Sequence, residues 1–174
     1  MEESGRLLRE FAESAPDYPA PHFYLADIYF DQGRYRESLA ESLEAARIVG
    51  EEGMAKIYRA AQQGYAADGR EGLLEAMLAE QLGQHAQGKV SAYKVARTLA
   101  FLDRTEPALT HLALAVAERE PDSLGIKIDS AFRSLHGNAR FRGILAQAGH
   151  AMSFSGEAVE MAVDAVRSGT EAPR

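Results

Sequence analysis

Residues 22–50 read HFYLADIYFDQGRYRESLAESLEAARIVG, and this stretch is the strongest indication of the fold. Apolar and small residues recur at helical spacing on both sides of Gly33, which predicts two helices joined by a short turn. The large and small positions that fit this pattern are Leu25, Ala26, Tyr29, Tyr35 and Ala45. Helices this short cannot bury an apolar stripe alone, so such pairs are expected to pack against one another as hairpins.

The turn recurs along the chain at a nearly constant spacing. Gly33 lies in YFDQGRY, Gly69 lies in YAADGRE 36 residues later, and Asp103 takes the glycine position in AFLDRTE after a further 34 residues. A helix–turn–helix unit with a period of about 34 residues resembles the tetratricopeptide repeat. The resemblance implies an all-α helical-hairpin repeat array, a right-handed superhelix or α-solenoid, with C-terminal capping helices.

The stretch IDSAFRSLHGNARFRGILAQAGH, residues 128–150, comes after the last unit. It resembles the tail that often closes tetratricopeptide arrays in bacterial signalling and transcription-regulator proteins. Asn138 in this stretch is expected to cap a helix at its N-terminus. The predicted array covers residues 1–150, with a half repeat over 4–18, units over about 19–52, 55–88 and 89–122, and a cap over 123–150.

Residues 151–174 are expected to form a terminal helix, from about 156 to 167, followed by a disordered tail. Its apolar face, formed by Val159, Ala162, Val163 and Val166, would cover the last hairpin or dock on another chain.

The composition of the 174 residues favours a folded, soluble, cytoplasmic protein. The net charge of −7 makes the surface a poor match for a phosphate backbone, so nucleic acid is disfavoured as a ligand. There is no cysteine, which excludes disulfides and thiolate metal sites. The N-terminus lacks the pattern of a signal peptide, and no apolar run is long enough to cross a membrane.

Residues 83–90, GQHAQGKV, have the glycine spacing of a phosphate-binding P-loop. A P-loop needs a buried strand before it and Ser or Thr after the lysine, but here a helical sequence precedes Gly83 and Val90 follows Lys89. The stretch therefore predicts a turn between hairpins. The five histidines show no metal-ligand spacing. We expect no enzymatic activity, no cofactor and no metal.

In arrays of this family the first helix of each hairpin lines an inner groove, and its solvent-facing residues contact the ligand. The resemblance places ten residues on that face: Phe23, Asp27, Phe30, Asp31, Lys56, Arg59, Gln63, Tyr93, Arg97 and Phe101. Aromatic and arginine side chains are the types that dominate binding hot spots. The alternative is that some of the aromatic residues pack under neighbouring helices.

The predicted function is therefore a non-catalytic scaffold that binds a peptide or helix of a protein partner in the concave groove. A ligand with apolar side chains and some negative charge would suit Phe23, Phe101, Arg59 and Arg97. One alternative is self-assembly into a homodimer through the end of the array, where Leu7, Leu8 and Phe11 would form the interface. Another is a regulatory domain of a larger signalling or transcription-regulator protein.

Overall fold

The computed structural model describes residues 2–149, and within this range the chain is helical and contains no strand. The helices are α1 (Glu2–Ser14), α2 (Ala20–Asp31), α3 (Tyr35–Val49), α4 (Glu52–His85), α5 (Ala92–Phe101) and α6 (Thr105–Ala117). Two 3₁₀ helices, η1 (Pro121–Gly125) and η2 (Ser130–Leu135), and an α-helix over residues 139–149 complete the described chain. The all-α class is confirmed. The expected helix at 156–167 lies outside the described residues.

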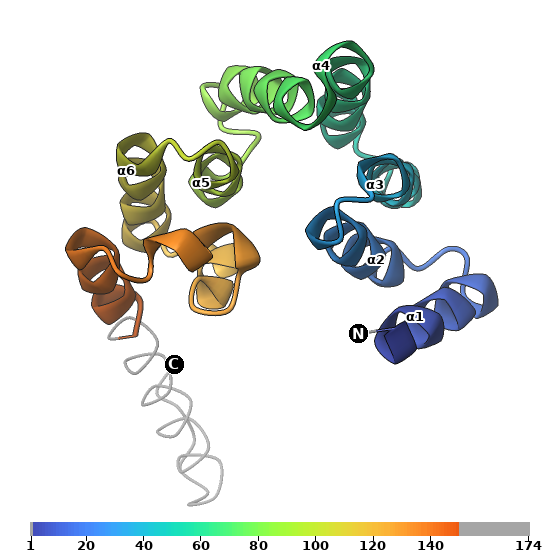
Figure 1. Cartoon of the computed structure of the whole chain (residues 1–174), viewed down its shortest axis with the longest axis horizontal. Helices are drawn as coiled ribbons and strands as arrows, with labels where there is room; N and C mark the ends of the chain where they lie inside the picture. The colour runs from blue at the N-terminus through green and yellow to red at the C-terminus, as the bar shows by residue number, and fades with distance from the viewer. Residues whose placement is uncertain (1, 150–174) are drawn as a thin grey trace, which may run out of the picture.

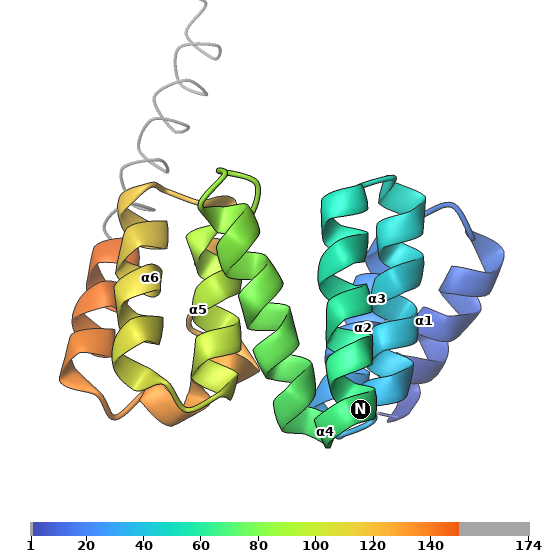
Figure 2. The ribbon, with the colours of Figure 1, turned by 90° about the horizontal axis from the view of Figure 1, so that it is seen from above.

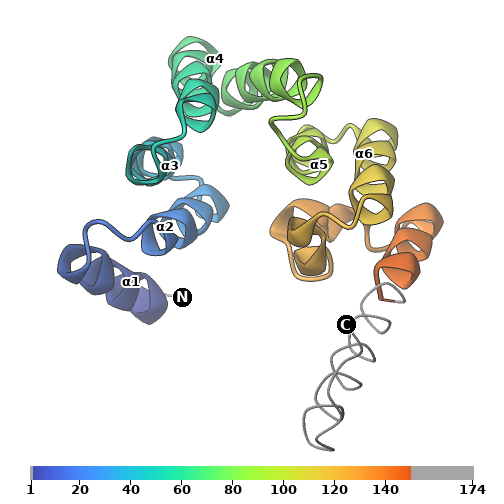
Figure 3. The ribbon, with the colours of Figure 1, turned by 180° about the vertical axis from the view of Figure 1, so that it is seen from behind.

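The helices form an arc in which successive elements pack side by side (Figure 1). Helices α2 and α5 lie on its inner side, whereas α3 and α6 lie on its outer side, and the view from behind gives the same arrangement (Figure 3). Segment 121–135, which contains η1 and η2, turns back inside the arc and packs on α5 and α6. We call it the closing segment.

The three turn positions of the predicted repeat share one backbone feature. Gly33, Gly69 and Asp103 all have positive φ, at 74°, 54° and 57°. Around Gly33 and Asp103 the hydrogen bonds also match: the N–H groups of Arg34 and Arg104 donate to the carbonyl groups of Tyr29 and Leu99, at 2.8 and 2.9 Å. A residue with positive φ ends a helix and reverses the chain, which explains why glycine recurs there and why Asp103 is strained.

The turn at Gly69 is sharper, and it lies inside α4. Asp68 and Gly69 have non-helical angles, so α4 consists of a first half, residues 52–67, and a second half, residues 70–85. A Cβ atom on Gly72 would lie 2.3 Å from the carbonyl oxygen of Gly64, so the two backbones touch where the halves cross. Figure 2 shows the halves diverging from this point, with α1–α3 beside the first and α5 and α6 beside the second.

The buried apolar residues are concentrated in the C-terminal part of the arc. Phe132 and Phe141 are completely buried there, between α5, α6 and the helix at 139–149. A smaller cluster of Leu39, Ala61, Leu73 and Leu74 joins α3 to both halves of α4. Asn138 caps the helix at 139–149, because its side-chain oxygen accepts hydrogen bonds from the N–H groups of Arg140 and Phe141 at 2.8 and 3.2 Å. This cap was predicted from the sequence.

Candidate interaction surface on the inner side of the arc

Side chains from the C-terminal halves of α2 and α5 contact one another. The sequence resemblance had assigned these residues to one face. Arg97 of α5 donates a hydrogen bond of 3.1 Å to Asp27 of α2, although the two residues are 70 positions apart. The rings of Phe30 and Phe101 lie 4.7 Å apart, and Phe30 also contacts Tyr35 at 5.2 Å. The structure therefore brings the first and third predicted units together on one surface.

Arg97 also contacts the closing segment, and this creates a small charged cluster. Its Nε atom lies 2.8 Å from Oδ2 of Asp129, which is close enough for an ion pair although the N–H is not aligned for a hydrogen bond. The hydroxyl of Tyr93 donates to the same oxygen at 2.8 Å. Burial alone would lower the pKa of Arg97, but the charges of Asp27 and Asp129 outweigh it and raise that pKa. Arg97 therefore stays charged at any physiological pH.

Tyr93 is buried, which corrects the expectation that it faces solvent. Only 5% of the residue is exposed, because Phe132 packs edge-on against its ring at 5.5 Å and Asp129 accepts a hydrogen bond from its hydroxyl. Burial, and after it the negative charge of Asp129, raises the pKa of the Tyr93 hydroxyl. The closing segment thus covers the inner side of α5, so Tyr93 is not available to a partner in this conformation.

The other nine predicted groove residues keep some exposure. Asp31 is exposed and accepts a hydrogen bond of 2.8 Å from the hydroxyl of Ser130, a further link to the closing segment. Four of the nine are half-buried: Phe23, Phe30, Arg97 and Phe101. Four others are exposed: Asp27, Lys56, Arg59 and Gln63. Arg59 forms an ion pair with Glu52 on its own helix. The most exposed of the predicted groove residues therefore lie on α2 and the first half of α4.

Asp129 and Ser130 belong to this site, but the sequence did not single them out. They lie in the stretch whose resemblance predicted a cap, and nothing in their spacing shows that the cap folds back inside the arc. Asp129 also accepts a hydrogen bond of 3.0 Å from the N–H of Ala131, so it begins η2 as an N-cap. An aspartate two residues before a run of apolar residues is a capping signal that could have been noticed.

The N-terminal end of the arc carries the second predicted surface. Leu7 and Phe11 of α1 are 53% and 47% exposed, and Leu8 is half-buried. Phe11 packs edge-on against Tyr18, at 5.9 Å between ring centres, and Tyr18 is itself 53% exposed. Leu7, Phe11 and Tyr18 therefore form an exposed apolar end, and Tyr18 is a member that the sequence pattern did not indicate.

The sequence GQHAQGKV forms the end of α4 and a turn, as predicted. Helix α4, and not a strand, precedes the turn, and Gly88 has φ of 70°. His85 Nδ1 lies 2.8 Å from the carbonyl oxygen of Val90, and the rings of His85 and His111 are 5.3 Å apart. Among residues 2–149 no three His, Asp or Glu side chains are arranged to hold a metal ion.

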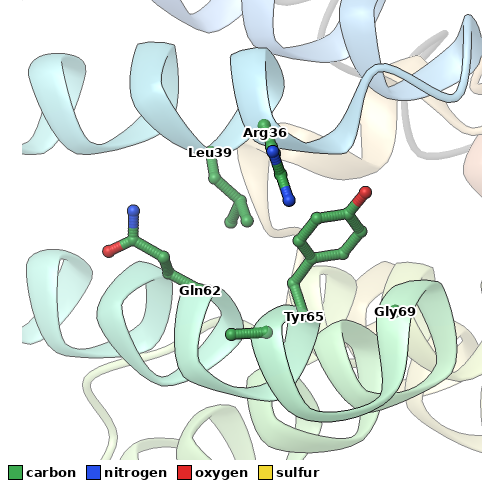
Figure 4. A pocket seen from close by; sticks show the side chains of 6 residues that line it. Arg36, Leu39, Gln62, Tyr65 and Gly69 are labelled. Carbon is green, nitrogen blue, oxygen red and sulfur yellow. The ribbon is translucent and has the colours of Figure 1, made fainter.

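Two pockets border α4. A pocket of about 410 Å³ between α3 and the first half of α4 is lined by Arg36, Leu39, Gln62, Tyr65, Ala66 and Gly69 (Figure 4). Arg36 and Gln62 are exposed there, and Arg36 Cζ lies 6.0 Å from the centre of the Tyr65 ring. A second cavity, of about 370 Å³, lies between the two halves of α4 and the loop that leads to α5. We call it the α4 cavity.

Comparisons with family models, with curated proteins and with solved structures find no match to this chain. Over the part of the chain that the structure describes, no helix combines the length and the apolar character that a membrane span requires.

Proposed function

We propose that this protein is a tetratricopeptide-like helical array that binds a peptide or helix of another protein on its inner surface, without catalysis. The hydrogen bond between Asp27 and Arg97 is the observation that carries the proposal. It joins helices from the first and third predicted units, so Asp27 and Arg97 lie side by side although they are 70 positions apart. The shared positive φ of Gly33, Gly69 and Asp103 supports the repeat interpretation.

The open part of this surface suggests where the partner lies. Phe23 supplies partly exposed aromatic area on α2, while Lys56 and Arg59 supply exposed positive charge on the first half of α4. A partner with an apolar side chain flanked by carboxylates would match both features, and the cations would set its orientation. Because the closing segment already covers Tyr93, the partner would contact α2 and the first half of α4 more than α5.

Selection from a displayed library of random peptides would test the proposal, followed by titration of the selected peptides by fluorescence anisotropy. We expect Phe23→Ala and Arg59→Glu each to weaken binding by about tenfold or more, as expected for hot-spot residues. Tyr24→Ala and Arg47→Glu are matched controls, because both residues are exposed but neither belongs to the predicted groove. Selected peptides that bind all four variants as tightly as the wild type would contradict the proposal.

Self-assembly is the second candidate function, and the exposure of Leu7 and Phe11 favours it. Two copies would bury these side chains together with Tyr18. Sedimentation of the wild type and of Leu7→Glu would test this. Dimerisation that rises with concentration in the wild type and is lost in the variant would support it, whereas a wild type that stays monomeric at all concentrations would contradict it.

A further inference from the structure

The α4 cavity combines three kinds of lining group. Residues from the start of α4, the end of α4 and the following loop surround its volume of about 370 Å³, which falls in the range of roughly 300–1,000 Å³ that is typical of small-molecule sites. The lining residues on which the argument depends are Met54, Ile57, Gln81, Val90, Lys89 and Lys94.

The cavity exists because the two halves of α4 diverge from a fixed crossing. Their backbones touch at Gly64 and Gly72, and they separate toward Gly53 and Gln84. At the open end the side-chain amide of Gln84 donates hydrogen bonds to the carbonyl oxygen of Gly53 and to Glu80, at 2.9 and 2.8 Å. This amide ties the two halves together, so the cavity is held open at a defined width.

Gln81 lies one turn before Gln84 and differs from it in one respect. Both residues are buried, at 6% and 7% exposure, but Oε1 of Gln81 has no hydrogen-bond partner. A buried polar atom without a partner costs free energy, so a ligand that supplied a donor to it would recover part of that cost. Because no hydrogen bond holds this oxygen, a turn about the terminal side-chain torsion can present it to the cavity that Gln81 lines.

The rest of the lining defines what a ligand must carry. Ile57 and Val90 are buried apolar residues, at 5% and 9% exposure, and they would contact a hydrocarbon group. Lys89 and Lys94 are exposed at the rim and outnumber Glu51, the one carboxylate among the lining residues, although the chain carries a net charge of −7. An anion is attracted to such a rim, and Gln81 requires a hydrogen-bond donor.

We propose that the α4 cavity binds a small organic carboxylate that carries an amide N–H and a branched apolar side chain. The apolar side chain lies against Ile57 and Val90, the N–H donates to the side-chain oxygen of Gln81, and the carboxylate pairs with Lys94 at the rim. An N-acylated amino acid such as N-acetyl-leucine has all three groups. The site uses other residues than the proposed partner surface, because none of the ten predicted groove residues lines the cavity.

Three probes of similar size test this ligand class on the full chain. N-acetyl-leucine has the carboxylate and the N–H, N-acetyl-leucine amide lacks the charge, and 2-acetoxy-4-methylpentanoate carries an ester oxygen in place of the N–H. The methyl signals of Met54, Ile57 and Val90 in a ¹³C-methyl NMR titration report binding in the cavity. We expect N-acetyl-leucine to bind at least about tenfold more tightly than either other probe, the ratio produced by roughly 1.4 kcal/mol.

Two variants test whether Gln81 and Lys94 cause the preference for N-acetyl-leucine. Gln81→Leu removes the unpartnered oxygen, so we expect a higher melting temperature together with equal affinities for N-acetyl-leucine and 2-acetoxy-4-methylpentanoate. Lys94→Gln is expected to lower the affinity for N-acetyl-leucine to about that for N-acetyl-leucine amide. Lys127→Gln changes an exposed lysine outside the cavity and should leave the preference intact. Absence of binding by N-acetyl-leucine, equal binding of all three probes, or an unchanged preference in Gln81→Leu would each overturn the proposal.

Discussion

Helices α2 and α5 occupy corresponding places in the first and third predicted units, yet their surroundings differ. Helix α5 is buried along most of its length, because α4, α6 and the closing segment pack around it. Helix α2 buries Pro21, Leu25, Ala26 and Tyr29, and leaves Asp27 exposed on its inner side. The same position in a repeat can therefore be core or surface, depending on whether a later segment of the chain folds back over it.

The two ends of the arc differ in the size of their apolar cores. The closing segment makes the C-terminal end a dense core, which suits a structural support. The N-terminal end has a thinner core and keeps charged and aromatic side chains accessible, which suits recognition. Substitutions at the two ends should therefore differ in their effects on stability.

Removing the ring of Phe132 should have the largest effect on stability. Phe132 is completely buried between Tyr93 and Phe141, so Phe132→Ala leaves a cavity and should lower the free energy of unfolding by about 3–5 kcal/mol. Phe30→Ala, at the half-buried contact with Phe101, should cost clearly less. Urea unfolding followed by circular dichroism measures both, and equal losses would contradict the division between the two ends.

The two carboxylates that contact Arg97 should also differ. Asp129 keeps 11% of its side chain exposed, caps η2 and accepts from Tyr93, so Asp129→Ala should cost about 2–3 kcal/mol. Asp27 is 63% exposed, and Asp27→Ala should cost less than about 1 kcal/mol. The same unfolding measurement compares them, and a larger loss for Asp27→Ala would show that α2, not the closing segment, holds Arg97.

The crossing inside α4 sets the angle between the two ends. In Gly72→Ala the new Cβ atom would lie 2.3 Å from the carbonyl oxygen of Gly64, so the halves must separate, at a cost of about 1–3 kcal/mol. Gly83→Ala is the matched control: it lies in α4 with free space around it, and should stabilise the protein by about 0.5–1 kcal/mol. Thermal unfolding with opposite signs for the two variants would confirm the close crossing, whereas a Gly72→Ala protein as stable as the wild type would contradict it.

The smallest expected effect is on the pH dependence of stability, through His111 in α6. Burial, and after it the charge of His85, lowers the pKa of His111 below the ordinary value of 6.5. Between the lowered pKa and about 6.5 the unfolded chain binds more protons than the folded one, so stability falls as the pH drops through this window. His111→Phe should remove that part of the pH dependence, whereas His136→Gln, at an exposed histidine, should retain it. The urea unfolding midpoints of both variants at pH 7.5 and 5.5 measure this effect. The same change of midpoint with pH in both variants would contradict this role of His111.

The sequence was sufficient for features that depend on local chemistry. The helical pattern, the turn at Asp103 and the cap at Asn138 depend on residues within a few positions of one another. The same holds for the turn at Gly88, because a P-loop would have required a preceding strand.

Features that depend on residues far apart in the chain were not predictable in this way. The burial of Tyr93 requires the closing segment to fold back, and its spacing within α5 does not reveal this. The contact between Gly64 and Gly72 was also missed, because two glycines on either side of a turn show no sign of how closely the helices cross. The unpartnered oxygen of Gln81 likewise becomes visible only when its surroundings are known.

The proposed function requires a partner to bind the open inner surface on α2 and the first half of α4. Chemical-shift mapping of the tightest selected peptide on the isotopically labelled protein locates the bound peptide directly. We expect the largest shifts at Phe23, Asp27, Lys56 and Arg59, with the signals of Phe132 unchanged. Shifts confined to the outer helices α3 and α6, or to Leu7 and Phe11 at the N-terminal end, would contradict the proposed function.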